Sequence, residues 1–98
     1  MNSVNIAGRI SDEAVKATSG NGLPFVRFKI TVDKNSKDSN GGYDVFEIVA
    51  FRELADLNYE VGRYVAITGK LSANNYEKED KQYFNCSIIA SAISMMGK

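Results

Sequence analysis

The stretch Phe25–Val32, FVRFKITV, decides the fold, because its side chains alternate with a period of two. One face carries Val26, Phe28, Ile30 and Val32, and the other carries Phe25, Arg27, Lys29 and Thr31. A period of two is typical of a half-buried β-strand. Pro24 precedes the strand, where its missing N–H does little harm. We therefore predict a strand with a core face and a basic outer face that has an aromatic residue at its edge.

Four more segments show the same alternation, at residues 4–10, 43–51, 63–71 and 83–96. Both faces of 43–51 are largely apolar, which predicts a central strand. Residues 52–60 form the one convincing helical stretch, and Gly62 follows as a stop. This order predicts an all-β domain, a five-stranded Greek-key OB-fold barrel with one short helix between strands 3 and 4. The alternative, a β-sandwich, normally needs about seven strands.

The alternation also predicts which side chains fill the barrel. The expected core includes Val4, Ile6, Ile10, Phe28, Phe46, Val65, Ile67, Leu71, Phe84, Cys86 and Ile88. Gly8 and Gly69 interrupt apolar faces, which predicts a bulge or a close backbone approach at both positions. The polar segments 11–24, 33–42 and 74–82 are predicted to be connections, the last of them a hairpin loop.

Composition narrows the class of protein. The chain has 98 residues, enough for a single domain over 1–98, and its 44% apolar and 24% charged residues are near the average for a globular protein. We find no membrane-spanning run or secretion signal, so we expect a cytoplasmic protein. With no histidine and one cysteine, Cys/His zinc sites and imidazole-based triads are excluded. We expect no enzyme, no metal and no cofactor; the remaining catalytic alternative is a small carboxylate-based hydrolase.

Charge is distributed unevenly although its sum is zero. The balance is +3 over residues 1–37, −5 over 38–62 and +2 over 63–98. Acidic residues concentrate on the predicted helix and its approaches, whereas bases mark the second strand and two polar loops. This distribution predicts a basic groove opposite an acidic back, and such a groove can follow a phosphate backbone. The alternative for Arg27 and Lys29 is an ordinary solvated strand face.

Aromatic side chains are expected beside these bases. Phe25, Phe51 and Tyr43 fall on the outer face or its rim, and Tyr76 falls in the last polar loop. Exposed rings next to cations suit unpaired nucleotides, because every base has a face that can stack. For Phe51, burial beneath the helix or in a subunit contact stays open as an alternative.

Four segments together resemble the bacterial-type single-stranded DNA-binding proteins. They are VNIAGRI at 4–10, NGLPFVRFKITV at 21–32, DVFEIVAFRELAD at 44–56 and VGRYVAITGKL at 61–71. The resemblance implies that Phe51 and Tyr76 occupy stacking positions and that Lys70 and Asn74 lie where the family makes basic or polar contacts. Val45 stands where the family often has a ring, so that stacking site is expected to be lost. Glu47 stands where a positive residue is common, which implies local repulsion of phosphate.

We therefore predict binding of single-stranded DNA largely without sequence preference, in replication, recombination or repair. The predicted phosphate contacts are Arg27, Lys29, Lys34, Lys37, Lys70, Lys78 and Lys81, and the predicted stacking residues are Phe25, Tyr43, Phe51 and Tyr76. The resemblance implies a homotetramer, or a dimer. The residues given end without the acidic tail that the resemblance implies for recruiting replication proteins, so we expect either a trimmed core domain or a short form of the family. The alternative function is a primosome-type adaptor that acts mainly through protein contacts.

Overall fold

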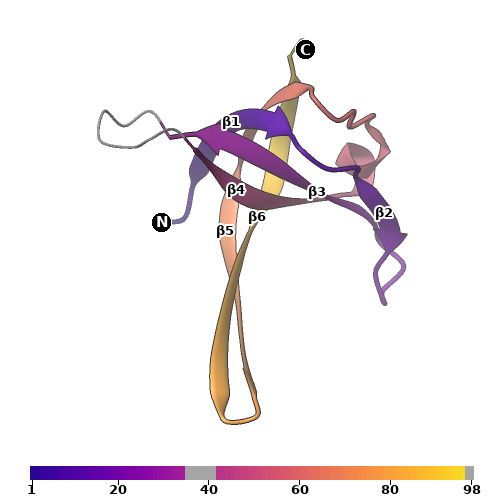
Figure 1. Ribbon diagram of the computed structural model, residues 1–98. Coiled ribbons are helices and arrows are strands. Elements are labelled where there is room, and N and C mark those ends of the chain that lie inside the picture. The colour runs from indigo at the N-terminus through magenta and orange to yellow at the C-terminus, as the bar shows by residue number, and fades with distance from the viewer. Residues whose placement is uncertain (35–41, 97–98) are drawn as a thin grey trace.

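The computed structural model describes residues 1–34 and 42–96, and at residues 74–76, 83 and 84 it describes the backbone alone. The elements are β1 (Val4–Ile10), β2 (Val15–Thr18), β3 (Pro24–Asp33), β4 (Tyr43–Phe51), the 3-10 helix η1 (Arg52–Asp56), β5 (Tyr64–Lys78) and β6 (Lys81–Met95) (Figure 1). Within these described residues, no helix has the length and apolar character needed to cross a membrane.

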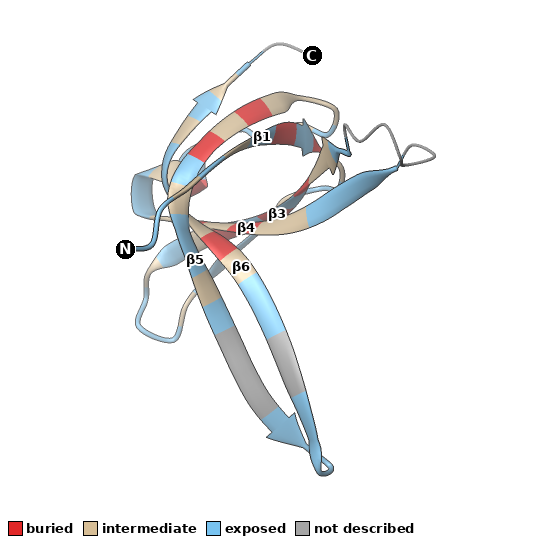
Figure 2. Cartoon of the chain, turned by 90° about the vertical axis from the view of Figure 1, so that its left-hand side faces the viewer, coloured by how far each residue is buried: buried red, intermediate tan, exposed pale blue. Residues whose placement is uncertain are grey.

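The strands form one sheet that closes on itself. Its order is β1-β5-β6-β4-β3-β2, and an additional pairing between β1 and β3 completes the ring. Figure 2 looks into this ring and shows the buried positions along its inner wall. Every strand pair is antiparallel except β4 with β6, which run parallel. The predicted five-stranded OB-fold barrel is confirmed, with β2 as a short addition outside the ring. Residues 11–24, expected to be a connection throughout, therefore contain a strand.

The barrel interior follows the predicted alternation. Its fully buried side chains include Ile10, Val26, Phe28, Ile30, Ile48, Val65, Ile67 and Ile88, and Val4, Ile6 and Phe46 pack against them from partly buried positions. Apolar residues therefore fill the ring from every one of its five strands. The side chain of Phe84, a further predicted core residue, lies outside the described part of the chain.

The helix expected over 52–60 is a single 3-10 segment that ends at Asp56. Leu57 is already extended, with ψ of 158°. The chain then returns so that the Tyr59 ring stacks on Phe28, with centroids 4.4 Å apart and planes 24° apart. The Tyr59 hydroxyl donates to the Leu54 carbonyl, and burial raises the pKa of Tyr59 to about 12. This tyrosine therefore fixes the segment across one end of the core.

The prediction of a hairpin loop over residues 74–82 is wrong. Strands β5 and β6 continue through it and are joined only by Glu79 and Asp80, whose φ angles are 53° and 64°. Two positive φ values in a two-residue connection are the geometry of a type I′ turn, which matches the twist of paired strands. The result is a long two-stranded projection, visible below the barrel in Figure 1, that we call the arm (residues 72–87).

Two predicted core residues are exposed because the arm leaves the barrel. Leu71 is 49% exposed, and Cys86 is also exposed. Strand β6 pairs with β4 only at Ile88 and Ile89, so Cys86 lacks that neighbour. Strand β1 pairs with β5 only as far as Gly69, so Leu71 lies beyond β1. Leu71 and Cys86 therefore keep the parity of the inner face, but no strand that the structure describes on the opposite side of the barrel covers their side chains.

Gly8 and Gly69 mark the close approaches that were predicted. A Cβ added at Gly8 would lie 2.5 Å from the Thr31 carbonyl oxygen, and one added at Gly69 would collide with the Ile89 carbonyl. The β5–β6 register shifts between Thr68 and Gly69, which is the expected irregularity. Backbones therefore pack at these two positions with no room for a side chain.

Replacing Gly8 by alanine should destabilise the protein by about 1–3 kcal/mol, because the new methyl group overpacks the contact between β1 and β3. Urea unfolding measures this change. Gly20→Ala is the matched control, since no heavy atom lies within 4 Å of its added Cβ; its effect should stay within about 0.5 kcal/mol. Equal stability of Gly8→Ala and the wild type would contradict the close approach.

Candidate nucleic-acid interface

The outer face of β3 and β4 is the centre of the candidate site. The two strands pair without interruption over nine positions, from Phe25↔Phe51 to Asp33↔Tyr43. Directly paired residues lie on the same side of a sheet, and successive residues alternate sides. Because Val26, Phe28 and Ile30 are buried inside the barrel, their odd-numbered neighbours face outward. The predicted Phe25, Arg27 and Lys29 thus share one face with Phe51 and Tyr43.

Two rings and one cation meet at one end of this face. The Phe25 and Phe51 centroids are 5.9 Å apart with planes inclined at 44°, and the Arg27 guanidinium lies 5.9 Å from the Phe25 centroid. Both phenylalanines are half-buried. Each therefore keeps part of its ring surface accessible beside a positive charge. Phe51 packs beside Phe25 on this outer face, while its possible role in a subunit contact stays a prediction.

Glu47 lies among the bases of the same face. Its carboxylate Oε1 is 3.7 Å from Arg27 Nε, and Glu47 is directly paired with Lys29 across the strands. The Arg27 and Glu47 side chains are 56% and 38% exposed. Together with Asn85, Cys86 and Ser87 they line a polar pocket of about 330 Å³, between the barrel face and the start of the arm. The basic face is therefore interrupted by one carboxylate.

Lys70 belongs to the same side of the sheet through its register. It pairs with Ile89, Ile89 pairs with Val49, and Val49 pairs with Arg27. With about 4.8 Å between neighbouring strands, this row places the Lys70 and Arg27 backbones roughly 14 Å apart along the curved sheet. Lys70 is exposed. The cationic face thus spans β3, β4, β6 and β5.

Tyr43 and Lys34 lie at the opposite end of the strands. Tyr43 is 60% exposed and lies eight positions from Phe51, which is about 27 Å of strand. Lys34 Nζ lies 3.3 Å from Asp44 Oδ1. The predicted contact Lys37 falls in 35–41, outside the described residues.

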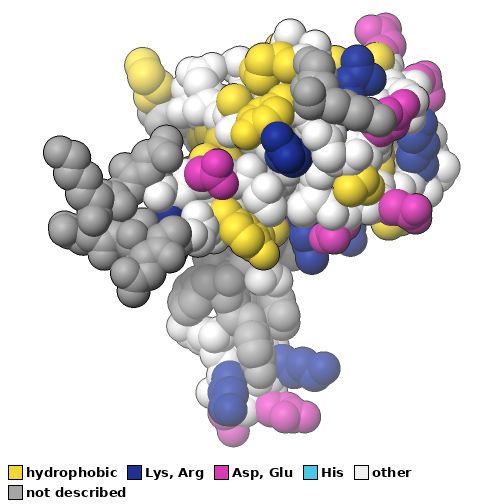
Figure 3. Space-filling view, turned by 45° about the horizontal axis from the view of Figure 1, so that its top comes forward, with side chains coloured by type: hydrophobic (Ala, Val, Ile, Leu, Met, Phe, Trp, Pro, Cys, Tyr) yellow, Lys and Arg dark blue, Asp and Glu magenta, His cyan; other side chains and the backbone are white. Residues whose placement is uncertain are grey.

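The predicted arm lysines stand apart from this face. Lys78 and Lys81 pair next to the turn, where Glu77, Glu79 and Asp80 are also exposed (Figure 3). Lys81 lies six positions from Ser87 of the pocket, which is about 20 Å of strand. The tip is not a purely basic site. The Asn74 and Tyr76 side chains lie outside the described part of the chain, so their predicted roles stay predictions.

Sequence reasoning missed Asn85 and Ser87. Both were assigned to the last strand without a role, and Cys86 between them was expected in the core. Their position follows from the parallel pairing of β6 with β4, which begins at Ile88. Polar residues that alternate with Phe84, Cys86 and Ile88 are typical of any half-buried strand, so no local signal marks Asn85 and Ser87 as site residues.

A closed barrel with rings and cations on one outer face has the architecture of an OB-fold binding domain. The single-strand binding protein family model matches residues 1–96, and the chain belongs to that family.

Individual relatives agree with this assignment. The single-stranded DNA-binding protein of Aquifex aeolicus (strain VF5) is 27% identical over 105 residues, covering 100% of this chain and 71% of that protein. Over two further curated relatives the chain spans 65% and 55% of their length.

Solved structures show the same fold. A crystal structure of the small single-stranded DNA-binding protein from Streptomyces coelicolor is 25% identical with a TM-score of 0.72, covering 96% of this chain and 93% of that one. The Plasmodium falciparum SSB in its complex with ssDNA is 19% identical with a TM-score of 0.84, covering 98% and 95%.

The exposure of Cys86 predicts a reactive thiol in the native protein. Dithionitrobenzoate should titrate one thiol per chain without denaturant, because the side chain is accessible to solvent. The reference is the same reaction in urea. A thiol that reacts only after unfolding would contradict the exposed position and restore the core assignment.

Proposed function

We propose that this chain binds single-stranded DNA along the outer face of β3 and β4, with stacking and phosphate contacts that accept any base along most of the path. The observation that carries the proposal is the uninterrupted register that aligns Phe25, Phe51, Arg27 and Lys29 on one face. Membership of the single-strand binding protein family supports it, as do relatives named for binding single-stranded DNA. Those names do not favour the adaptor alternative.

Each predicted residue has a physical role in this proposal. Phe25 and Phe51 stack bases at one end of the face, and Tyr43 stacks at the other. Lys29, Lys34 and Lys70 neutralise phosphates, which releases counterions, and Arg27 adds positive charge beside the stacking rings. Lys37, Asn74, Tyr76, Lys78 and Lys81 would extend the path into the 35–41 segment and the arm. The proposed function is binding without catalysis, and its cellular setting is DNA replication, recombination or repair in the cytoplasm.

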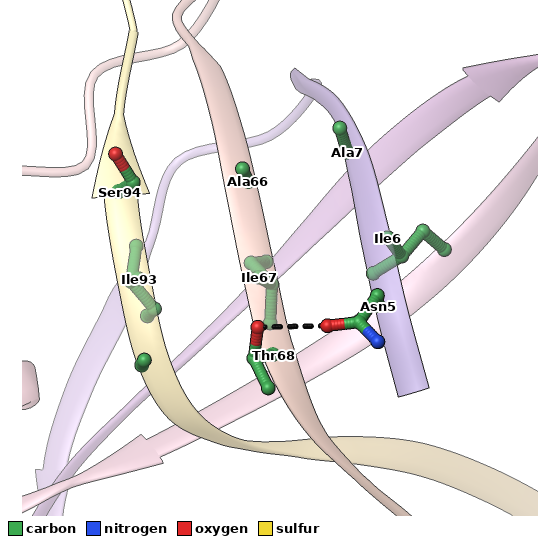
Figure 4. Close-up of a pocket in the computed structure, with 9 residues that line it drawn as sticks. Asn5, Ile6, Ala7, Ala66, Ile67, Thr68, Ile93 and Ser94 are labelled. Carbon is green, nitrogen blue, oxygen red and sulfur yellow. Dashed lines mark hydrogen bonds between the residues drawn. The ribbon is translucent and has the colours of Figure 1, made fainter. Parts of the chain in front are cut away.

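We further propose that the chain acts as a homo-oligomer, a tetramer or a dimer. The outer side of β1, β5 and β6 supports this, because a hollow of about 430 Å³ there is lined in part by small side chains, such as Ala7, Ala66 and Ser94 (Figure 4). The Thr68 hydroxyl donates to Asn5 Oδ1 at 2.9 Å, so two polar side chains at the hollow are bonded to each other (Figure 4). Such a surface allows a second sheet to approach closely.

Removing one stacking ring should weaken binding. Phe51→Leu keeps an apolar side chain at this half-buried position but loses the aromatic face, so affinity for a dT oligomer should fall by about 1 kcal/mol or more. Fluorescence anisotropy of a labelled oligomer measures this change. The matched control is Tyr64→Leu on β5, where the ring lies 4.8 Å from the Arg9 guanidinium. Unchanged affinity in Phe51→Leu, or an equal loss in both variants, would contradict the assignment.

Salt dependence tests the phosphate contacts. In Lys70→Gln, the slope of log affinity against log salt concentration should become shallower by about 0.7, because one fewer counterion is released. Lys16→Gln is the control, since Lys16 pairs with Val26 and therefore shares the parity of the inner face. Anisotropy titrations at four salt concentrations give both slopes. Identical slopes for Lys70→Gln and the wild type would remove Lys70 from the path.

A further inference from the structure

We propose that the pocket formed by Arg27, Glu47, Asn85, Cys86 and Ser87 receives the edge of a guanine base, so that one position of the bound strand is selected. This inference rests on the proposed function, because it assumes that single-stranded DNA follows the outer face of β3 and β4. It concerns a part of that face which stacking and phosphate contacts leave unexplained. The unexplained feature is Glu47, a carboxylate among cations.

A phosphate is the wrong ligand for this pocket. Glu47 Oε1 lies 3.7 Å from Arg27 Nε, and Glu47 is directly paired with Lys29. A phosphate that approached Arg27 from the pocket would meet this carboxylate at close range, where like charges repel. The pocket instead offers donors from Arg27 and acceptors from Glu47 side by side, and Asn85 and Ser87 each add groups that can donate or accept. A neutral group with both kinds of hydrogen-bonding atoms fits this lining.

Among the four bases, guanine has the matching edge. Its N1–H and N2–H₂ groups are adjacent donors and can face the two oxygens of one carboxylate. Its O6 and N7 atoms are acceptors, and arginine is their commonest partner. Thymine presents one N–H between two carbonyl oxygens, and these oxygens would face the carboxylate. Cytosine and adenine each present a single amino group toward it. Arg27 and Glu47 together therefore complement guanine best.

The pocket lies at the right place along the strand. Arg27 is two residues from Phe25, which is about 7 Å along β3, and its guanidinium lies 5.9 Å from the Phe25 centroid. A base that stacks on Phe25 or Phe51 therefore has the pocket as its neighbour on the same face. The arm supplies the other wall, since Asn85, Cys86 and Ser87 all belong to β6. Stacking holds the DNA strand on the face, and the pocket binds the edge of the neighbouring base.

The test compares 16-nucleotide strands that are matched in length and charge, namely d(TG)₈, d(TA)₈, d(TC)₈ and d(TT)₈. Fluorescence anisotropy at fixed salt should give about fivefold tighter binding of d(TG)₈ than of d(TA)₈, at the low end for a bidentate base contact because the pocket is open to solvent. Comparing two purines keeps the stacking contribution similar. In Glu47→Gln the ratio between these two strands should fall to about one, since the amide retains a single acceptor oxygen.

Glu13→Gln is the matched control, because it removes the same charge from a different pocket, beside Tyr59 and Val61. It should keep the fivefold ratio. Equal binding of all four strands by the wild type would overturn the guanine pocket while leaving the proposed function intact. A uniform gain in affinity for every strand in Glu47→Gln, with the ratio unchanged, would also overturn it, because Glu47 would then act only by repelling phosphate. Absence of binding to every strand would instead contradict the proposed function itself.

Discussion

The uninterrupted pairing of β3 with β4 is the constraint on which the rest of the structure depends. Over nine positions no bulge changes the parity of either strand, so one set of side chains enters the core and the other set lies outside. A slip of one residue would exchange the two sets, placing Arg27 and Lys29 in the interior. The buried Val26, Phe28 and Ile30 oppose such a slip because each would lose its apolar surroundings. Core packing therefore fixes the geometry of the candidate interface.

Closing the barrel creates the rest of the site. The strands β1 and β3 meet over only two residue pairs, and Gly8 allows the close backbone approach to Thr31 beside them; Gly69 allows a second close approach, between β5 and β6. The β5–β6 register shifts at Gly69, two residues before Leu71 and close to the start of the arm. Asn85 and Ser87 stand at this point of departure, where β6 has not yet met β4. The pocket beside Arg27 thus exists because β5 and β6 are longer than the barrel.

The sequence predicts the parts of the fold that depend on local alternation. Residues 25–32 and 43–51 show their two faces directly, so the core side chains and the outer cluster of Phe25, Arg27 and Phe51 could be assigned. The exposure of Leu71 and Cys86 could not be predicted in this way. Alternation indicates which side of a strand a residue faces, but not where the strands on the opposite side of the barrel end. Residues 74–82 of the arm do not look like strands in the sequence, because all of them except Tyr76 are polar or charged and no apolar alternation is present. Asn85 and Ser87 entered the site through long-range pairing, which no local pattern encodes.

The charge pattern can be interpreted once the ion pairs are located in the structure. Half-exposed pairs such as Arg27–Glu47 and Lys34–Asp44 contribute about 0–1 kcal/mol to stability, so folding gives little reason to keep them. Their effect on a ligand is larger, because each acid competes with phosphate for a cation on the proposed path. A chain with zero net charge therefore cannot hold DNA by a general positive field. It must rely on rings, single cations and hydrogen bonds at particular positions, and in our proposal the carboxylate beside Arg27 makes one of those positions a place where a base edge is bound.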